Sequence, residues 1–159
     1  MARYTVPGMD PASADEVVAM LQDRLNSTID LQLTLKHVHW NVVGKNFVGV
    51  HEMLDPWVAD VSLMSDTLAE RIATLGGVPH GTPGYVVGHR RWEDYAVDKA
   101  QSLTHLKALD RVYENVIADH RKVVDDIEKY DLVSQDLLVA QCEKLEMQQW
   151  FVRAHLDES

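Results

Sequence analysis

The chain has 159 residues, of which 46% are hydrophobic and 25% charged, and its formal net charge is −10. This composition predicts one globular domain over residues 1–159 and excludes disorder. The negative charge opposes nonspecific binding to nucleic acid or membrane and favours cationic partners. No stretch approaches the roughly 18 apolar residues of a membrane span, the N-terminus lacks the apolar core of a secretory signal, and the single cysteine fits a reducing cytoplasm.

The first predicted helix begins near residue 13. Ser13 and Glu16 have the spacing of a capping box, with Ser13 as the N-cap, which leaves residues 1–12 as an N-terminal extension. Apolar residues then recur on one face as far as about residue 39: Val18, Leu21, Leu25, Ile29 and Leu35. Because His39 follows Leu35 by four residues, its side chain is expected on the buried side of the last turn.

A second helix is predicted from about Phe47 to Leu75, after a short loop of residues 41–46 that contains a glycine. Gly76 and Pro79 end this helix, since glycine permits a left-handed cap and proline cannot continue a helix. Residues 78–95 have no sustained helical period and form a connection with room for one short helix. The connection is longer than the usual helix–helix turn of about 2–8 residues, so it can cross the whole bundle.

Two further amphipathic helices complete the chain. One has apolar residues at helical spacing from Leu103 to Ile127, residues 131–134 interrupt the pattern, and the other contains Leu138 and Leu156. Four long amphipathic helices with one long middle connection predict an all-α, ferritin-like four-helix bundle.

Histidines and carboxylates of the second helix are arranged in a pattern that suits a metal. With His51 as origin and about 100° per residue, three carboxylates fall at roughly 40°, 60° and 100° on one stripe of the helix: Asp55, Asp66 and Glu70. A helix face that only contacts solvent would carry the same stripe of carboxylates. However, imidazole and carboxylate without thiolate are the ligands expected for iron, manganese or zinc with open coordination positions.

The axial spacing indicates that these ligands are shared between two chains. His51 and Asp66 are about 22 Å apart along one helix and cannot hold the same metal ion. A helical hairpin would bring His39 to His51 and leave Asp66 and Glu70 at the far end. A second copy of the helix, antiparallel across a two-fold axis, would reunite the two halves and create two equivalent sites per dimer.

A metal centre inside each bundle is not expected. In ferritin-like di-iron proteins that centre uses Glu-x-x-His pairs. No glutamate of this chain is followed by a histidine three residues later.

Two motifs in these helices resemble those of the Dps family, the bacterial miniferritins. The first is His-Trp-Asn-Val-x-Gly-x-x-Phe-x-x-x-His-x-x-x-Asp at residues 39–55, and the second is Asp-x-x-Ala-Glu-Arg-Ile-x-x-Leu-Gly at residues 66–76. The predicted helix layout is also similar to that family over nearly the whole chain. The resemblance implies a hollow dodecamer with ferroxidase sites at its two-fold interfaces.

The resemblance also implies roles for individual residues. Iron would be held by three residues of one subunit and two of its mate: His39, His51 and Asp55, with Asp66 and Glu70. Trp40 matches the tryptophan beside the family's site, where it either intercepts radicals or anchors the helix end. The family oxidises Fe²⁺, typically with hydrogen peroxide, and stores the Fe³⁺ mineral in its cavity. Zn²⁺ would compete for the same ligands.

Two features depart from the family's pattern. Pro56 follows Asp55 and disfavours the helical conformation of the residue before it, so we expect a kink or an irregular first turn, with Asp55 as the weakest ligand. The family's DNA binders usually have a basic tail, whereas here Arg3 is the one basic residue near the N-terminus and the chain ends Asp-Glu-Ser. Twelve such subunits would carry roughly −120 formal charges, which argues against DNA binding.

For the other titratable residues the sequence predicts structural roles or leaves two roles open. Asp131 and Asp136 either solvate a helix terminus or, as the resemblance implies for this region, line an iron-uptake pore on a three-fold axis. Cys142 lies on an apolar stripe and is expected to be buried. The histidines outside the motifs are expected to be structural or at the surface.

Three functional hypotheses follow. The first is a cytoplasmic cage that oxidises and stores iron and thereby protects DNA from oxidative damage. The second is a nucleoid-binding module that protects DNA with little dependence on ferroxidase activity. The third is a structural helical oligomer whose site holds zinc. The ligand pattern favours the first.

Overall fold

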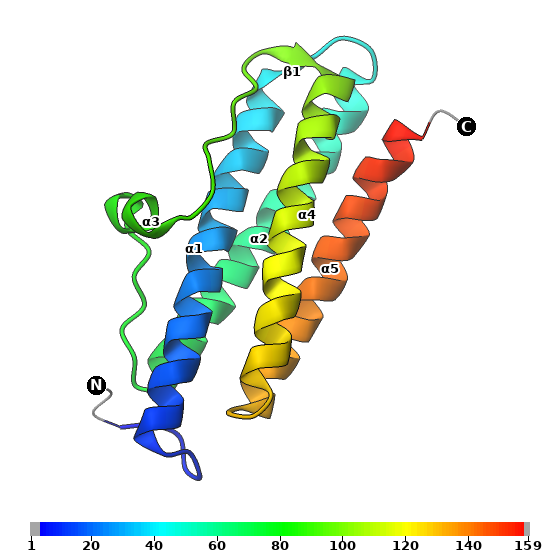
Figure 1. Ribbon diagram of the computed structural model, residues 1–159. Coiled ribbons are helices and arrows are strands. Elements are labelled where there is room, and N and C mark those ends of the chain that lie inside the picture. The colour runs from blue at the N-terminus through cyan, green and yellow to red at the C-terminus, as the bar shows by residue number, and fades with distance from the viewer. Residues whose placement is uncertain (1–3, 158–159) are drawn as a thin grey trace.

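The computed structural model describes residues 4–157 and confirms the all-α bundle (Figure 1). Its four long helices are α1 (Pro11–Asn41), α2 (Phe47–Thr74), α4 (Ser102–Ile127) and α5 (Leu132–Leu156). The connection contains the short helix α3 (Pro83–His89). Two short strands, β1 (Val42–Val43) and β2 (Ala100–Gln101), pair in parallel. None of the helices in residues 4–157 is long and apolar enough to cross a membrane.

The first helix begins earlier than its sequence pattern predicted. Asp10, and not Ser13, is the N-cap, because its carboxylate accepts hydrogen bonds from the backbone N–H groups of Ala12 and Ser13 at 3.1 and 3.0 Å. Pro11 occupies the first turn, where its fixed φ and missing N–H group suit a helix start. The predicted capping box of Ser13 and Glu16 is therefore wrong.

The break before the last helix is also displaced. α4 ends at Ile127 and α5 begins at Leu132, so residues 128–131 interrupt the helical pattern rather than residues 131–134. Asp131 accepts the backbone N–H groups of Val133 and Ser134 as the N-cap of α5.

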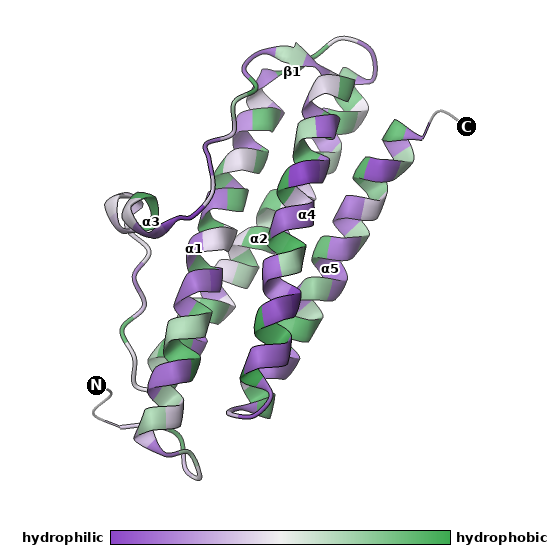
Figure 2. Ribbon diagram, viewed as in Figure 1, coloured by the Kyte–Doolittle hydropathy of each residue, from purple (hydrophilic) through white to green (hydrophobic). Residues whose placement is uncertain are grey.

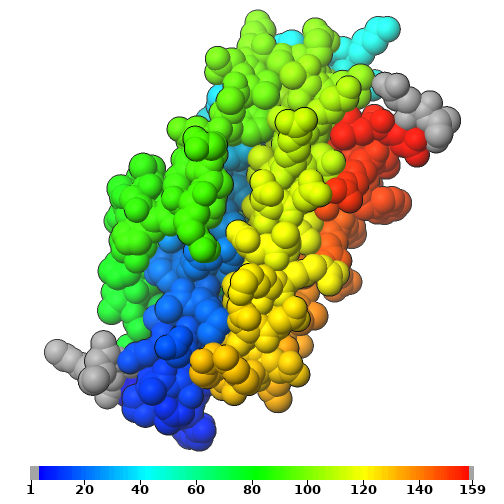
Figure 3. Space-filling model, viewed as in Figure 1, coloured from blue at the N-terminus to red at the C-terminus, as the bar shows by residue number. Residues whose placement is uncertain are grey.

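The crossover carries the chain from one end of the bundle to the other, as its length predicted. α1 and α2 form one antiparallel hairpin and α4 and α5 form another, and the connection between them runs along α1 (Figure 1). The space-filling view shows this connection packed on α1 beside α4 (Figure 3). The pairing of Val42 with Ala100 joins the end of the connection to the loop that follows α1.

Apolar faces of the long helices meet in two clusters. Hydrophobic and hydrophilic residues alternate along each of these helices, as amphipathic helices require (Figure 2). The cluster nearer the α1–α2 loop includes Leu35, Leu54, Trp57, Leu109 and Tyr113. The cluster at the other end includes Leu21, Leu68, Ile72, Ile127 and Leu138. Cys142 is buried, as predicted.

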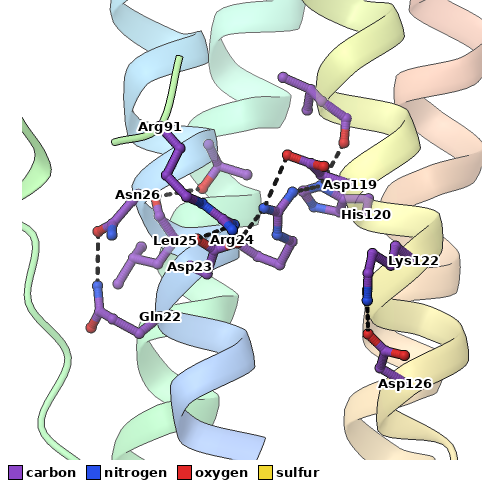
Figure 4. A network of polar contacts seen from close by, with 12 residues as sticks. Gln22, Asp23, Arg24, Leu25, Asn26, Arg91, Asp119, His120, Lys122 and Asp126 are labelled. Carbon is purple, nitrogen blue, oxygen red and sulfur yellow. Dashed lines mark hydrogen bonds and ion pairs between the residues drawn. The ribbon is translucent and has the colours of Figure 1, made fainter. Parts of the chain in front are cut away.

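A polar network with a buried arginine and a buried histidine links α1, the connection and α4 (Figure 4). Arg24 of α1 is fully buried and pairs with Asp23, which also accepts two hydrogen bonds from Arg91 of the connection at 2.8 and 2.7 Å. The Arg24 guanidinium lies 3.4 Å from Nδ1 of His120, whose Nε2 is 3.3 Å from Oε1 of Gln141. Burial, together with the charge of Arg24, lowers the pKa of His120 to about 4, so this imidazole is neutral near pH 7.

Candidate metal centre

The loop between α1 and α2 brings His39 and His51 face to face, as the hairpin predicted. Their rings stack with centroids 3.6 Å apart and 23° between the ring planes. His39 is buried and His51 is half-buried. The tight loop needs positive φ at Gly44 (89°) and Asn46 (62°), and these two residue types tolerate that conformation best.

Each histidine is oriented by the backbone of the other. Nδ1 of His39 lies 3.0 Å from the carbonyl oxygen of His51, and Nδ1 of His51 lies 2.9 Å from the carbonyl oxygen of His39. A carbonyl can only accept, so each Nδ1 carries a proton, and in the neutral imidazole Nε2 is then the nitrogen with the lone pair. Neither Nε2 has a hydrogen-bond partner within residues 4–157. Both rings are therefore held in the tautomer that binds a metal through Nε2.

Asp55 adds a carboxylate to this pair, and His39, His51 and Asp55 together are called the half-site below. Oδ1 of Asp55 lies 3.4 Å from Nδ1 of His39 and 3.3 Å from Nζ of Lys36. α2 continues through Pro56 without interruption, although proline cannot donate to the carbonyl four residues earlier. The helix thus keeps Asp55 beside His39 despite the proline, with the carboxylate against Nδ1 of the ring rather than Nε2.

Asp66 and Glu70 lie on α2 far from the half-site. Both residues are exposed, and neither carboxylate has a hydrogen bond or ion pair in the described part of the chain. Asp66 lines an open groove of about 690 Å³ between α1 and α2. No group of three or more His, Cys, Asp or Glu side chains in residues 4–157 is placed to hold a metal ion. Within the described residues the half-site is therefore not a metal site by itself, and a single chain leaves Asp66 and Glu70 apart from it.

The α1–α2 hairpin exposes several large apolar side chains. Trp40 is 70% exposed, with Nζ of Lys36 5.8 Å from its ring centroid, and Leu33 and Leu63 are 61% and 57% exposed. Phe47 packs against His51 with ring centroids 5.0 Å apart. Exposed apolar groups in this number are typical of a surface that another protein covers.

Asp131 and Asp136 occupy different environments. Asp131 is buried at the start of α5 and accepts a hydrogen bond from Arg71 of α2 at 2.7 Å. Burial alone would raise the pKa of Asp131, but its hydrogen bonds with Ser134 and Arg71 outweigh burial and hold the pKa below its usual value. Asp136 is exposed and has no polar partner in residues 4–157. Asp131 therefore has the helix-capping role that the sequence left open.

Comparisons with known proteins place this chain in a family. A model of the ferritin-like domain matches residues 18–159. The whole chain is 54% identical to a DNA protection during starvation protein of Mycolicibacterium smegmatis and covers 87% of it. The chain belongs to the Dps family. The resemblance drawn from the two motifs is thus confirmed.

Two further comparisons show the range of proteins similar to this Dps chain. It is 46% identical, over 98% of its length, to the fine tangled pili major subunit of Haemophilus ducreyi, of which it covers 82%. Its fold is similar to a Mycobacterium smegmatis Dps structure with a TM-score of 0.98 and 53% identity, covering 100% of this chain and 96% of that one. The ferritin-like fold is therefore confirmed for the described residues 4–157.

Proposed function

We propose that this Dps protein oxidises Fe²⁺ at sites shared between two-fold related subunits and stores the Fe³⁺ product in a dodecameric cage. The reciprocal bonding of His39 and His51 through Nδ1, which leaves both Nε2 atoms without a hydrogen-bond partner in residues 4–157, carries the proposal. Neutral imidazole favours transition metals over Mg²⁺, and carboxylates suit the Fe³⁺ product.

The other ligands would be Asp66 and Glu70 of the partner subunit. These carboxylates are exposed and unpaired within residues 4–157 of one chain, which suits ligands completed by a second copy. A two-fold axis placing α2 antiparallel to its mate creates two equivalent sites. The side chain of Glu70 is longer than that of Asp66, so Glu70 is the ligand that would bridge two ions. The exposed side chains of Leu33, Leu63 and Trp40 would supply apolar area for this interface.

The proposed reaction uses two Fe²⁺ ions and one hydrogen peroxide. Each Fe²⁺ gives one electron, the O–O bond breaks, and two protons from solvent complete two water molecules and leave two Fe³⁺ ions. Because both electrons reach the same peroxide, no hydroxyl radical is released. Lys36 has to leave the Asp55 carboxylate before that oxygen can bind iron. Trp40, exposed beside Lys36, is proposed as a trap for stray radicals.

Iron oxidation in the presence of Zn²⁺ tests this function. We expect ferric absorbance to rise on mixing the protein with Fe²⁺ and peroxide, faster than with oxygen alone. Zn²⁺ accepts the same ligands but has no redox chemistry, so it should inhibit. A protein that binds Zn²⁺ tightly and leaves Fe²⁺ unoxidised would instead be the structural oligomer.

We propose that DNA is protected by removal of iron and peroxide in the cytoplasm rather than by coating. The relative in Mycolicibacterium smegmatis is named for DNA protection during starvation. The formal net charge is −10 per chain, so twelve subunits carry a net charge of roughly −120. This charge repels the phosphate groups of DNA. In a gel shift at physiological salt, DNA should stay free at protein concentrations that oxidise all added iron. A retarded band that persists at that salt would favour the nucleoid-binding alternative.

Asp136 is the proposed carboxylate of an iron-uptake pore on a three-fold axis. Its side chain is exposed and unpaired within residues 4–157, as an uptake site requires. Asp131, bonded to Arg71, would hold the turn that presents Asp136.

A further inference from the structure

Tyr95 and His105 form a hydrogen-bonded pair between the crossover and α4. Oη of Tyr95 lies 2.9 Å from Nδ1 of His105, and the two rings are nearly parallel, with centroids 6.0 Å apart and 8° between planes. Tyr95 is half-buried, and His105 is fully buried. The proposed iron reaction gives neither residue a role.

His105 has an unusual polar environment. Its Nε2 is buried and has no hydrogen-bond partner, which is a costly arrangement in a protein interior and one that needs an explanation. Burial lowers the pKa of His105, whereas the backbone carbonyls of Asn41 and Asp98 favour its protonated form. Asn41 is the last residue of α1, and the C-terminal end of a helix favours a cation. The lowered pKa keeps His105 neutral in the resting protein, so its Nδ1 is available to accept the proton of Tyr95.

Tyr95 needs such a base if it is oxidised. Burial raises the pKa of Tyr95, so the phenol keeps its proton in the resting protein. Loss of one electron turns a phenol into a strong acid, which passes its proton to a base in contact with it. Nδ1 of His105, at 2.9 Å, is within the distance that proton transfer requires.

His37 links this pair to the half-site. Its ring meets Tyr95 edge-on with centroids 5.7 Å apart, and its Nε2 lies 2.9 Å from the carbonyl oxygen of Val97. His37 and His39 are two residues apart in α1, which is about 3 Å of axial rise. Because residues two apart turn by about 200°, His37 and His39 project from different sides of α1, so an electron from Tyr95 would pass the His37 ring and cross this helix to reach a proposed iron ligand.

We propose that Tyr95 is a redox-active tyrosine that gives one electron to the iron site when a single Fe²⁺ is bound, with His105 as its proton acceptor. The inference rests on the proposed ferroxidase function. Hydrogen peroxide needs two electrons, and one Fe²⁺ supplies only the first. Tyr95 supplies the second, its hydroxyl proton moves to Nδ1 of His105, and the O–O bond breaks.

The products balance. Two protons from solvent convert the peroxide into two water molecules, and the site is left with Fe³⁺, a neutral Tyr95 radical and protonated His105. The next Fe²⁺ to bind returns one electron to Tyr95 while His105 returns the proton. A subunit pair that meets peroxide with only one iron bound is thereby spared the release of hydroxyl radical.

Tyr113 offers a matched control within the same bundle. It is fully buried, and its Oη donates to Oε1 of Gln148 at 2.9 Å. An amide oxygen accepts a hydrogen bond but is not a base that takes up the proton. Oxidation of Tyr113 would therefore leave its proton without an acceptor, so this tyrosine should not form the radical.

Freeze-quench electron paramagnetic resonance tests the proposal. The full-length protein, with ring-deuterated tyrosine, is loaded anaerobically with one Fe²⁺ per proposed site, mixed with peroxide and frozen, and iron oxidation is followed in parallel. We expect a tyrosyl signal that is lost in Tyr95→Phe and kept in Tyr113→Phe. His105→Gln keeps an acceptor but lacks the base, so radical formation should slow roughly a hundredfold or more. With two Fe²⁺ per site, Tyr95→Phe should oxidise iron at the wild-type rate.

The outcomes separate this inference from the proposed function. A tyrosyl signal of unchanged size in Tyr95→Phe overturns the inference, and so does a signal that responds only to deuterated tryptophan. Iron oxidation in the wild type without any radical removes the role of Tyr95 and leaves the ferroxidase standing. Absence of iron oxidation in the wild type removes both.

Discussion

Replacing His51 by alanine is expected to lower peroxide-dependent iron oxidation at least roughly a hundredfold. The variant loses one proposed iron ligand and also loses the Nδ1 bond to the carbonyl of His39, at 2.9 Å. Loss of a group that only orients a ligand costs about 10–100-fold in metal affinity or activity, so loss of the ligand itself should cost more. Glu70→Ala should have a similar effect from the far end of α2.

The measurement is the initial rate of ferric absorbance at saturating Fe²⁺ and peroxide. His155→Ala is the matched control, because this histidine is exposed and its neighbours in the sequence include no proposed ligand; within residues 4–157 its Nδ1 contacts the carbonyl oxygen of Phe151 alone. It should retain the wild-type rate, and all three variants should keep the helical circular dichroism of the parent. Full activity in both His51→Ala and Glu70→Ala would remove the proposed site.

Acidification is expected to weaken the fold through His120. A histidine in the unfolded chain titrates near 6.5, whereas burial and Arg24 lower the pKa of His120 in the bundle to about 4. Below about pH 6.5 His120 binds a proton in the unfolded chain but stays neutral in the folded chain. The free energy of unfolding therefore falls as the pH falls. Neutral His120 makes its full contribution to the free energy of unfolding above that pH. Roughly 3 kcal/mol of this contribution is lost by about pH 4.

Urea unfolding at about pH 7 and pH 5, at one fixed protein concentration, measures this effect. His120→Gln has no titrating group at the position and should lose clearly less stability between the two pH values than the wild type does. His155→Gln, which changes an exposed histidine in the same way, should follow the wild type. Equal pH dependence in the wild type and His120→Gln would contradict the role of His120.

The long helices could be predicted because their apolar residues recur at helical spacing over more than twenty residues. The start of α1 could not be placed correctly from the same pattern. Ser13 and Glu16 have the right spacing for a cap, but Asp10 with Pro11 provides an earlier one. The two-residue pairing of β1 and β2 was also missed, because backbone contacts between the α1–α2 loop and the crossover leave no periodic pattern.

For the candidate site, the sequence predicted which residues lie close together. It did not predict the contacts that orient their side chains. The spacing of His39 and His51 predicted a hairpin that brings them together, and the rings do stack. It could not predict which nitrogen faces a metal, because the orienting groups are backbone carbonyls. The buried charge of Arg24 was missed for a similar reason, since its neighbour His120 lies far away along the chain.

Sharing of the site between subunits can be tested by mixing two inactive variants. When His51→Ala and Glu70→Ala subunits assemble at random, about half of the dimers contain one of each, and each mixed dimer has one intact site of two. The mixture should therefore recover about a quarter of the wild-type rate of iron oxidation, although neither variant is active alone. A mixture that stays as inactive as its two components would show that each chain holds its own complete site.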